Sequence, residues 1–471
     1  MTNLFEYQNK QKFKGSFQSL EDFLDVIWNK REKTGFYYNE ETDKLEVQQF
    51  IQFISKTQEL KSNKYVGIIH FEGQRINLFP KIFFDADKDY SSLEINAIHN
   101  HILWWLSYCR KIKFPNYQTS LGSLKSDFFE ILIYLFSKFT RDLLSHAIYQ
   151  QYEEVESELS FIKGRLNTNE YVHENIAKGK WHKLNCTYDA FVIDNKFNRI
   201  IKYVATLLFN ATSSSENKKN LREILFIFDE VSDVRATAEE CSSIRFNPIF
   251  GSFETVRDYC YLFLKNSISI EYRNDLKLFA FLLPMEYVFE DFIFGFIDKE
   301  IGEITAKSQI TSKYLDQGEN YNLRPDLLLE LDSKKIIADT KYKIIYQDAN
   351  DSKNGISQGD LYQMMAYAMR FKINEIKLFY PDTIKGYYKQ ESEIIINDEL
   401  ADGVDINIKS YQLPIINRGL LDQTEIKEVE LTKIFNTSRI KLMERINEIL
   451  LSHTSNSLIS HSQGTQDIKT I

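Results

Sequence analysis

Two aspartates and a lysine interrupt a run of apolar residues near position 330. The stretch RPDLLLELDSKKIIADTKYK, residues 324–343, has Asp326 before one predicted strand and Asp339 and Lys341 at the end of the next. Successive side chains of a strand point to opposite faces, so Asp339 and Lys341 share a face. Carboxylates beside an ammonium group are suited to metal-dependent hydrolysis of a phosphodiester.

The register of the predicted hairpin decides how closely these groups approach. If the chain turns at Asp332-Ser333, Asp326 and Asp339 lie directly opposite each other, with Cβ atoms about 4.5–5.5 Å apart. If a four-residue loop joins the strands instead, Asp326 faces Lys341 and lies diagonal to Asp339. In both registers two carboxylates and an ammonium group converge, which requires a cation or a shared proton.

Oxygen ligands of this kind suit Mg²⁺ or Mn²⁺. The expected ligands are Asp326, Asp339 and the backbone carbonyl of Thr340. A metal ion held there would polarise a phosphoryl oxygen and acidify a bound water. Lys341 would orient that water and offset negative charge in the transition state.

Two predicted helices carry further candidates. In DLYQMMAYAMRF, residues 360–371, the side chains of Asp360, Gln363 and Tyr367 fall on one face, within reach of a phosphate or a metal-bound water. The alternative is an ordinary amphipathic helix. In PMEYVFEDFIFGFI, Glu290 lies among phenylalanines and is either a further metal-site carboxylate or a partly exposed, paired residue.

The elements around these residues divide the chain into four parts. A chain of 471 residues is too long for one core. Residues 1–88 read as mixed α/β, with a hairpin turning at Glu72-Gly73 and a helix capped by Ser19. Residues 89–270 show mostly helical periodicity, and residues 271–452 give the helix, strand, strand, helix, strand order of an α/β core. Residues 453–471 are predicted to form a polar, loose tail.

Composition and charge restrict the class of protein. The chain is 43% hydrophobic, with a net charge of −9. A protein that binds DNA by itself is usually basic, so we expect a confined patch or a partner's help. The spacing of the four cysteines favours neither a metal site nor disulfides, which indicates the reducing cytoplasm. No apolar run reaches the roughly 18 residues of a membrane span, and no phosphate-binding G-x-x-x-x-G-K-[ST] motif is present.

The order of these motifs resembles a known family. R-P-D, then D-x-K, then a helix with Q-x-x-x-Y are similar to the PD-(D/E)XK nuclease superfamily. More narrowly, the chain resembles the McrC family, the nuclease subunit of McrBC-type restriction systems, which cut DNA that carries modified bases. The blocks YVGIIHFEGQRINLFPKI, FIKGRLN, CTYDAFVIDNKFNRIIKYV and PMEYVFEDFI extend the resemblance over most of the chain.

The resemblance implies roles for individual residues and a partner. Asp326, Asp339 and Lys341 match the family's nuclease triad. Gln363 and Tyr367 match its helix motif, and Glu290 matches the acidic position of its first core helix. It implies a PD-(D/E)XK core within residues 271–452. It also implies that the N-terminal half, with residues 1–88 as the docking region, binds a hexameric McrB-like AAA+ GTPase and stimulates it. The motor reads the modified base and translocates the double-stranded DNA.

Two other interpretations remain open at this point. A stand-alone PD-(D/E)XK repair nuclease would explain the triad but not the large N-terminal half. A non-catalytic regulatory subunit of the motor would explain the N-terminal half but not the intact triad.

Overall fold

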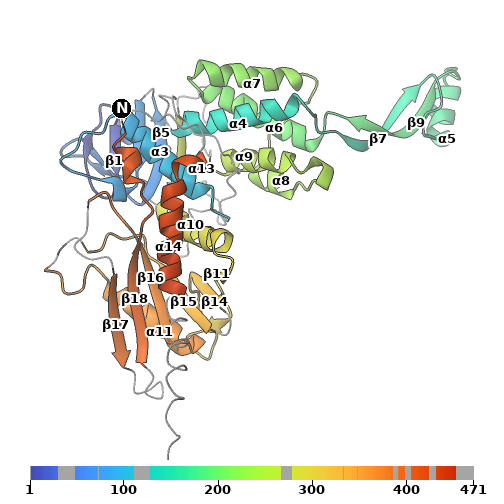
Figure 1. Ribbon diagram of the computed structural model, residues 1–471. Coiled ribbons are helices and arrows are strands. Elements are labelled where there is room, and N and C mark those ends of the chain that lie inside the picture. The colour runs from blue at the N-terminus through green and yellow to red at the C-terminus, as the bar shows by residue number, and fades with distance from the viewer. Residues whose placement is uncertain are drawn as a thin grey trace, which may run out of the picture. The chain divides into compact units, whose positions relative to one another are not determined.

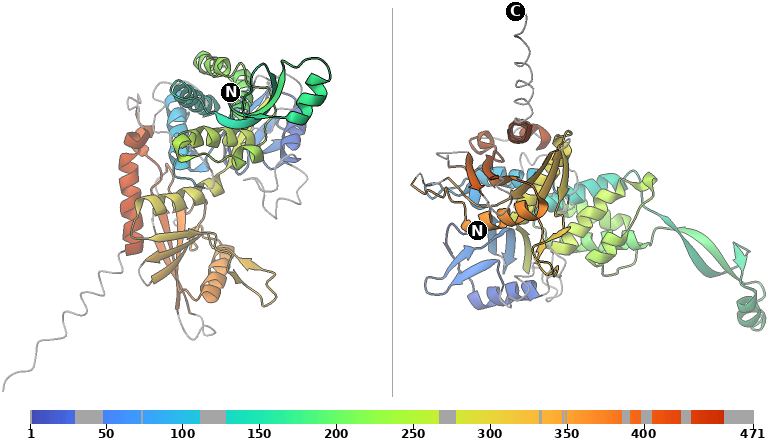
Figure 2. Two further views of the ribbon diagram at one scale, coloured as in Figure 1. Left: turned by 90° about the vertical axis from the view of Figure 1, so that its right-hand side faces the viewer. Right: turned by 90° about the horizontal axis from the view of Figure 1, so that it is seen from below.

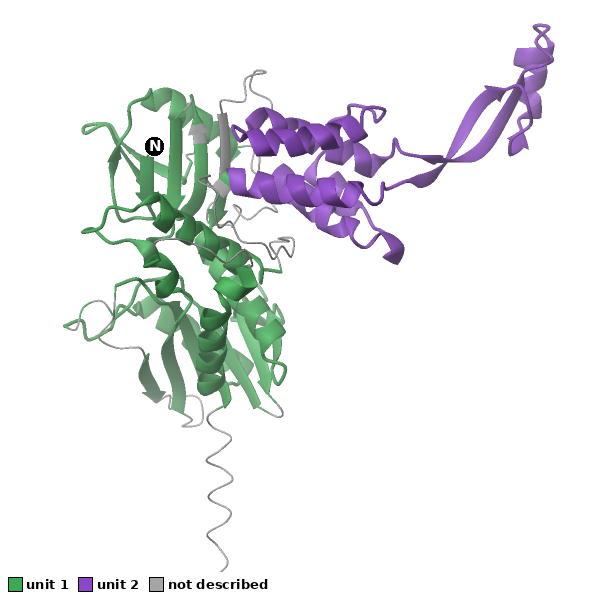
Figure 3. Cartoon of the chain, turned by 45° about the horizontal axis from the view of Figure 1, so that its top comes forward, with its two compact units in different colours: residues 1–129, 277–471 green, residues 130–276 purple. Residues whose placement is uncertain are grey.

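The computed structural model describes most of the chain. The described residues are 2–29, 48–72, 74–110, 128–266, 278–331, 334–346, 348, 350–385, 391–397, 405–423 and 431–451. The chain forms two compact units (Figure 3): Met1–Phe129 with Lys277–Ile471 is unit 1, and Glu130–Leu276 is unit 2. Helix α3 (Ser92–Leu106), which the sequence division assigned to the middle region, belongs to unit 1. The four-part division itself stays a prediction, and its tail, residues 453–471, lies outside the described residues.

A six-stranded mixed sheet forms the C-terminal half of unit 1 (Figure 1). Its order is β11 (Thr305–Ser308), β14 (Leu327–Leu331), β15 (Lys334–Thr340), β16 (Glu375–Pro381), β18 (Asp405–Leu413) and β17 (Glu391–Asn397). Strands β15, β16 and β18 run parallel, and the other neighbours pair antiparallel. The strands predicted on both sides of residue 332 and at residues 375–381 are therefore confirmed.

The β14–β15 hairpin has the register of the two-residue turn. Leu327 pairs with Ala338, and Leu331 pairs with Lys334. One step beyond the first pair, Asp326 falls opposite Asp339, so the four-residue loop is excluded. The turn residues Asp332-Ser333 themselves lie outside the described residues.

Helices cover both faces of this sheet. Met364 of α11 (Gln358–Phe371) packs in one cluster with Ile408 of β18, whereas Arg445 of α14 (Asn436–Leu451) lies 5.5 Å from the ring of Tyr411. Because Ile408 and Tyr411 are three positions apart on one strand, they point to opposite faces. Helices α11 and α14 accordingly flank the sheet on opposite sides (Figure 2).

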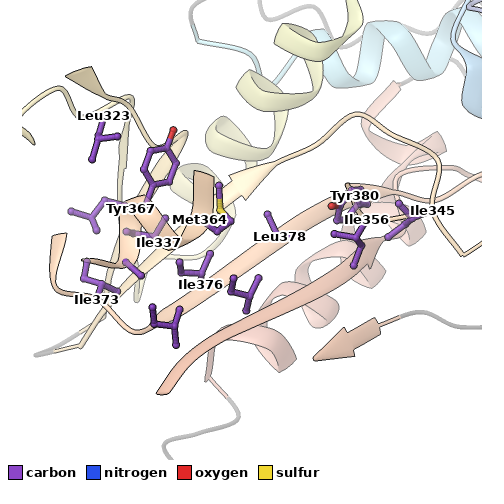
Figure 4. Packing of buried hydrophobic residues seen from close by; sticks show 14 of the residues in the cluster. Leu323, Ile337, Ile345, Ile356, Met364, Tyr367, Ile373, Ile376, Leu378 and Tyr380 are labelled. Carbon is purple, nitrogen blue, oxygen red and sulfur yellow. The ribbon is translucent and has the colours of Figure 1, made fainter. Parts of the chain in front are cut away.

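The core under α11 fixes the helix that carries Gln363 and Tyr367. Figure 4 shows Met364 and Tyr367 of α11 against Ile337, Ile376 and Leu378 of the sheet. All of these apolar side chains are buried, and burial of this kind contributes roughly 1.5–3 kcal/mol per large side chain. The helix begins at a cap in which the Ser357 hydroxyl accepts the Asp360 amide.

The N-terminal part of unit 1 contains a second sheet. Its order is β1 (Thr2–Phe5), β6 (Gln74–Phe79), β5 (Tyr65–Phe71) and β10 (Leu278–Pro284). The predicted β5–β6 hairpin is confirmed, although Gly73 of its turn lies outside the described residues. Strand β10 comes from the far end of the sequence and leads directly into α10 (Met285–Glu300). The N-terminal sheet is thus completed by a strand that adjoins the C-terminal core in sequence.

Smaller elements complete unit 1. They are β2 (Gln11–Lys12), α1 (Phe17–Asn29), β3 (Ile51–Ile54), β4 (Glu59–Ser62), the 3₁₀ helix η1 (Lys81–Phe83), β12 (Lys313–Tyr314), β13 (Asn322–Leu323), α12 (Arg418–Leu421) and α13 (Leu431–Ile434). The helix predicted to be capped by Ser19 begins at Phe17 instead. The Ser16 hydroxyl accepts the Ser19 amide at 3.2 Å, so the cap lies three residues earlier than expected.

Unit 2 is mostly helical, as predicted, but it also contains a sheet that the sequence did not predict. The helices are α4 (Phe128–Leu144), which begins in unit 1, and α6 (Lys196–Ala211), α7 (Ser215–Ile227), α8 (Ala238–Ser243), η3 (Pro248–Phe250) and α9 (Phe253–Asn266). The sheet is formed by β7 (Gln151–Leu159), β9 (Leu184–Val192) and β8 (Arg165–Leu166), with α5 (Thr168–Glu170) and the π-helix η2 (Tyr171–Ile176) at its end. It extends away from the helices of its own unit as an arm (Figure 3).

None of the helices in the described parts of the chain combines the length and the apolar character of a membrane span.

Candidate active site

The predicted site residues meet at the end of the β14–β15 hairpin. Asp326 immediately precedes β14, Asp339 and Thr340 end β15, and Lys341 follows. Strand β15 is fixed on both sides, by antiparallel pairing with β14 and by parallel pairing with β16. The carboxyl ends of parallel strands are where open α/β sheets present their binding groups.

Thr340 holds the carboxylate of Asp326. The Thr340 backbone N–H and its hydroxyl both donate to Asp326 Oδ2, each at 2.8 Å. Burial raises the pKa of Asp326 well above its usual range, and the negative charges of Asp339 and Glu290 raise it further. A carboxyl group in this position favours a bound proton or a nearby cation over an isolated charge.

Asp339 and Lys341 form a close ion pair. Asp339 Oδ2 lies 2.5 Å from Lys341 Nζ, and only 1% of the Asp339 side chain is exposed. Burial raises the pKa of Asp339, although Lys341 opposes that shift. Burial also opposes the charge of Lys341, but the carboxylates of Asp339, Asp326 and Asp360 outweigh it and raise the pKa of the lysine. Lys341 therefore keeps its positive charge at the site.

Helix α11 supplies a chain of hydrogen bonds behind Lys341. Lys341 Nζ donates to Gln363 Oε1 at 3.1 Å, and Gln363 Nε2 donates to the Tyr367 hydroxyl at 2.8 Å. The Tyr367 hydroxyl donates in turn to the Arg324 carbonyl at 3.0 Å. Burial and the charges of the two site aspartates raise the pKa of Tyr367, so the phenol stays protonated. Gln363 and Tyr367 are thus in contact with the predicted site.

Asp360 lies on the same helix but has a different partner. It accepts from Lys343 Nζ at 2.8 Å and 2.9 Å. Its charge nevertheless contributes to the raised pKa values of Asp339 and Lys341.

Glu290 of α10 lies beside the site. It is partly exposed, and its Oε1 accepts from Gln309 Nε2 at 2.7 Å. The Gln309 backbone N–H donates to the Asp326 carbonyl at 2.9 Å, which connects Glu290 to the same strand end. The charge of Glu290 contributes to the raised pKa of both aspartates. Its part as a metal ligand stays a prediction.

The site offers few protein ligands for a divalent cation. Within the described ranges, no three or more His, Cys, Asp or Glu side chains are grouped so as to hold a metal ion by themselves. Mg²⁺ usually takes one or two protein carboxylates and completes its shell with waters and substrate phosphates. Asp326, Asp339 and the Thr340 carbonyl match this small number of protein ligands.

The sequence did not identify two residues that lie near the site, Gln309 and Tyr380. Gln309 belongs to no recognisable motif, and it contacts Glu290, Arg324 and the Asp326 carbonyl. Tyr380 of β16 is fully buried, and burial together with the charges of Asp360 and Asp339 raises its pKa. The signal for Tyr380 is the parallel register, which pairs Asp339 with Leu378 and so puts Tyr380 on the face of Asp339. A single sequence does not disclose that register.

Comparisons with known proteins identify the family of the chain. A family model described as "McrBC 5-methylcytosine restriction system component" matches residues 60–381. A chain of the refined half-complex from the tetradecameric assembly of Thermococcus gammatolerans McrB AAA+ hexamers with bound McrC is similar at a TM-score of 0.64. The two chains are 16% identical, and the match covers 95% of this chain and 99% of that one.

A second similar structure is the cryo-EM structure of the Thermococcus gammatolerans McrBC complex, with 16% identity and a TM-score of 0.47 over 63% of this chain and 87% of that one. No match was found among curated proteins. At 16% identity, the first of these structures indicates a shared fold.

Proposed function

Because the chain belongs to the family described as McrBC 5-methylcytosine restriction system components, we propose that it is the DNA-cutting subunit of a modification-dependent restriction complex. The observation that carries the proposal is the convergence of Asp326, Asp339 and Lys341 at one sheet edge. The reaction is hydrolysis of a DNA phosphodiester with Mg²⁺ or Mn²⁺ as the metal.

The C-terminal core supports assignment to the PD-(D/E)XK type. A helix, α10, precedes an antiparallel hairpin that carries the acidic residues, and α11 crosses from β15 to a parallel β16. Apart from β11, β12 and β13, which come between α10 and β14, this is the helix, strand, strand, helix, strand order that the periodicity predicts for residues 271–452.

The chain's own residues would divide the work of hydrolysis. When bound, Mg²⁺ supplies polarisation of the phosphoryl oxygen and a more acidic water. Asp326, oriented by Thr340, and Asp339 provide the anionic ligands. Lys341, held by Asp339 and Gln363, orients the attacking water and offsets charge on the phosphoryl group. Tyr367 fixes Gln363 in turn.

We propose a hexameric McrB-like AAA+ GTPase as the partner. The similar solved chain comes from an assembly of McrB AAA+ hexamers with bound McrC. This chain carries no phosphate-binding loop motif, and its net charge of −9 suits a subunit that is brought to double-stranded DNA by another protein. The subunit would dock on the motor, stimulate its GTP hydrolysis and cut DNA that carries modified cytosine.

The arm of unit 2 offers a docking surface for that motor. Large apolar side chains on it are more than half exposed, among them Tyr152, Phe161, Ile162, Trp181 and Phe191. Exposed apolar groups at this density mark interaction surfaces. Docking through residues 1–88, as the sequence suggested, stays a prediction beside it.

The state of the four cysteines supports the proposed action in the reducing cytoplasm. Cys109, Cys186, Cys241 and Cys260 are all buried as thiols.

The experiment that separates this function from its rivals is reconstitution with the partner GTPase on DNA carrying 5-methylcytosine, with Mg²⁺ and GTP. We expect strand cleavage and faster GTP hydrolysis only when both proteins are present. Efficient cleavage by the chain alone would favour a repair nuclease. Faster GTP hydrolysis without cleavage would favour a regulatory subunit.

A further inference from the structure

The chain turns sharply immediately after Lys341. The Lys341 N–H donates to the Phe379 carbonyl at 2.8 Å, which is the last sheet bond of this strand. The Lys343 N–H then donates to the Lys341 carbonyl at 2.8 Å, which closes a three-residue turn centred on Tyr342. The backbone of Lys341 is therefore held by the sheet through its N–H and by this turn through its carbonyl.

Residues of the N-terminal part hold the side chain at the centre of the turn. Tyr342 is 3% exposed, and Lys81 Nζ lies 4.5 Å from the centroid of its ring. The Phe289 ring of α10 packs against it at 5.8 Å. Burial and the carboxyl group of Glu6 raise the pKa of the Tyr342 phenol, so it stays neutral. A cation over an aromatic face in a desolvated place is among the stronger contacts of its kind.

Two hydrogen bonds of the backbone anchor the segment that contains Lys81. Its backbone N–H donates to Glu6 Oε2 at 3.1 Å, which ties η1 to the end of β1. The next residue, Ile82, accepts from the Ile384 N–H at 3.0 Å, just beyond the end of β16. The segment that carries Lys81 is thus anchored to the N-terminal sheet and to the catalytic end of the C-terminal sheet, within one unit.

The charge environment agrees with a specific contact. Burial lowers the pKa of Lys81, the carboxylates of Glu6 and Glu286 oppose that shift, and Lys343 adds to it. The ring and the two carboxylates around Lys81 offset the unfavourable burial of its ammonium group.

We propose that Lys81 is a positioning residue, which holds Tyr342 and thereby fixes Lys341 for phosphodiester hydrolysis. The step from Lys341 to hydrolysis rests on the nuclease function proposed above. A small misplacement of a catalytic group lowers the rate by up to about 100-fold while substrate affinity is kept. The N-terminal part would in this way control the cutting end without touching DNA.

The test compares three substitutions in the reconstituted complex. Lys81→Met removes the cation and keeps the length of the side chain, and Lys81→Arg keeps the cation. Lys88→Met is the matched control, because Lys88 also pairs with a carboxylate and lies over a tyrosine in the same part of the chain, at Glu94 and Tyr90. We expect Lys81→Met to lower kcat about tenfold with KM for DNA changed less than about twofold, Lys81→Arg to restore kcat, and Lys88→Met to match the wild type.

Tyr342→Leu removes the same contact from its other side. Its loss of kcat should not multiply with that of Lys81→Met in the double variant, because one contact is lost in each case. Independent, multiplying losses would overturn the proposal, as would a Lys81→Met enzyme that cuts as fast as Lys88→Met.

Hydrogen exchange on the chain alone separates this proposal from the nuclease function. The Lys343 amide should exchange faster in Lys81→Met than in Lys81→Arg or Lys88→Met, whether or not the complex cuts DNA. Unchanged exchange at that amide would overturn the proposal and leave the nuclease function standing. A wild-type complex that never cuts DNA would contradict the nuclease function. The exchange result would then still test whether Lys81 holds Tyr342.

Discussion

At the scale of single residues, the site depends on how each carboxylate is held. Asp326 is oriented by two donors from Thr340, and Asp339 is paired with Lys341. The sequence predicted the meeting of these groups because strand periodicity and turn length restrict where charged side chains point. It did not predict the double donation by Thr340, because the hydroxyl donation depends on the rotamer of a threonine at a strand end.

Thr340→Val tests the hydroxyl donor. The backbone N–H still donates to Asp326, but the hydroxyl bond is lost, so we expect kcat for cleavage to fall about tenfold, since a hydrogen bond to a charged group contributes roughly 1.5–3 kcal/mol. Thr340→Ser keeps the donor and should retain most of the activity. Equal kcat in the valine and serine variants would show that the hydroxyl does not orient Asp326.

Glu6 should make stability depend on pH. Burial raises its pKa to about 7, against the opposing charge of Lys81. Because the folded chain holds this proton more tightly than the unfolded chain, the stabilising contribution is complete at acidic pH and is lost as pH rises through about 7. Glu6→Gln stays neutral, so its free energy of unfolding should exceed that of the wild type by up to roughly 3 kcal/mol above pH 7. Denaturant unfolding at several pH values measures the difference, and parallel pH profiles would refute it.

At the scale of elements, alternation and turn chemistry predicted the hairpin and its register, but not what covers it. Leu328, on the face of Asp326, is buried because α11 packs there. The β7–β9 pair escaped prediction because β7 has no buried face: its residues alternate between exposed and half-buried. Strand β7 is therefore defined by its long-range pairing with β9, and a single sequence does not reveal that pairing.

Leu328→Ala tests the packing of α11 on the hairpin. The leucine is 7% exposed and packs with Ile337 and Met364, so its truncation should lower the free energy of unfolding by about 2–5 kcal/mol. Leu93→Ala, at a residue that is 39% exposed, is the control and should change stability by less than about 1 kcal/mol. Denaturant midpoints of the two variants measure the contrast, and equal shifts would contradict the packing described for α11.

At the scale of the whole molecule, the N-terminal and C-terminal parts of unit 1 are built into one another. Strand β10 completes the N-terminal sheet and continues into α10 of the C-terminal core. The sequence shows the two α/β regions and their order, because each has its own periodicity. It does not show the pairing of β10 with β5, which joins segments about 200 residues apart.

Deletion of residues 1–88 should therefore damage the C-terminal core as well. The deletion removes the partner strand of β10 and the Lys81 contact with Tyr342. We expect the truncated chain to lose cooperative unfolding of the six-stranded sheet, measured by circular dichroism in denaturant, because an uncovered edge and apolar surface are exposed. A truncated chain that unfolds as cooperatively as the complete one would show that the core is independent.

Asp326 and Asp339, at one end of the β14–β15 hairpin, are the proposed metal ligands for DNA cleavage. The direct measurement is single-turnover cleavage of 5-methylcytosine DNA by the reconstituted complex with Asp339→Ala, beside Glu375→Ala as control. Glu375 begins another acid-x-lysine triplet, at the opposite end of the sheet, where it pairs with Lys334. We predict that Asp339→Ala abolishes cleavage and leaves GTPase stimulation intact, while Glu375→Ala still cuts. Cleavage by Asp339→Ala at the wild-type rate would contradict the account.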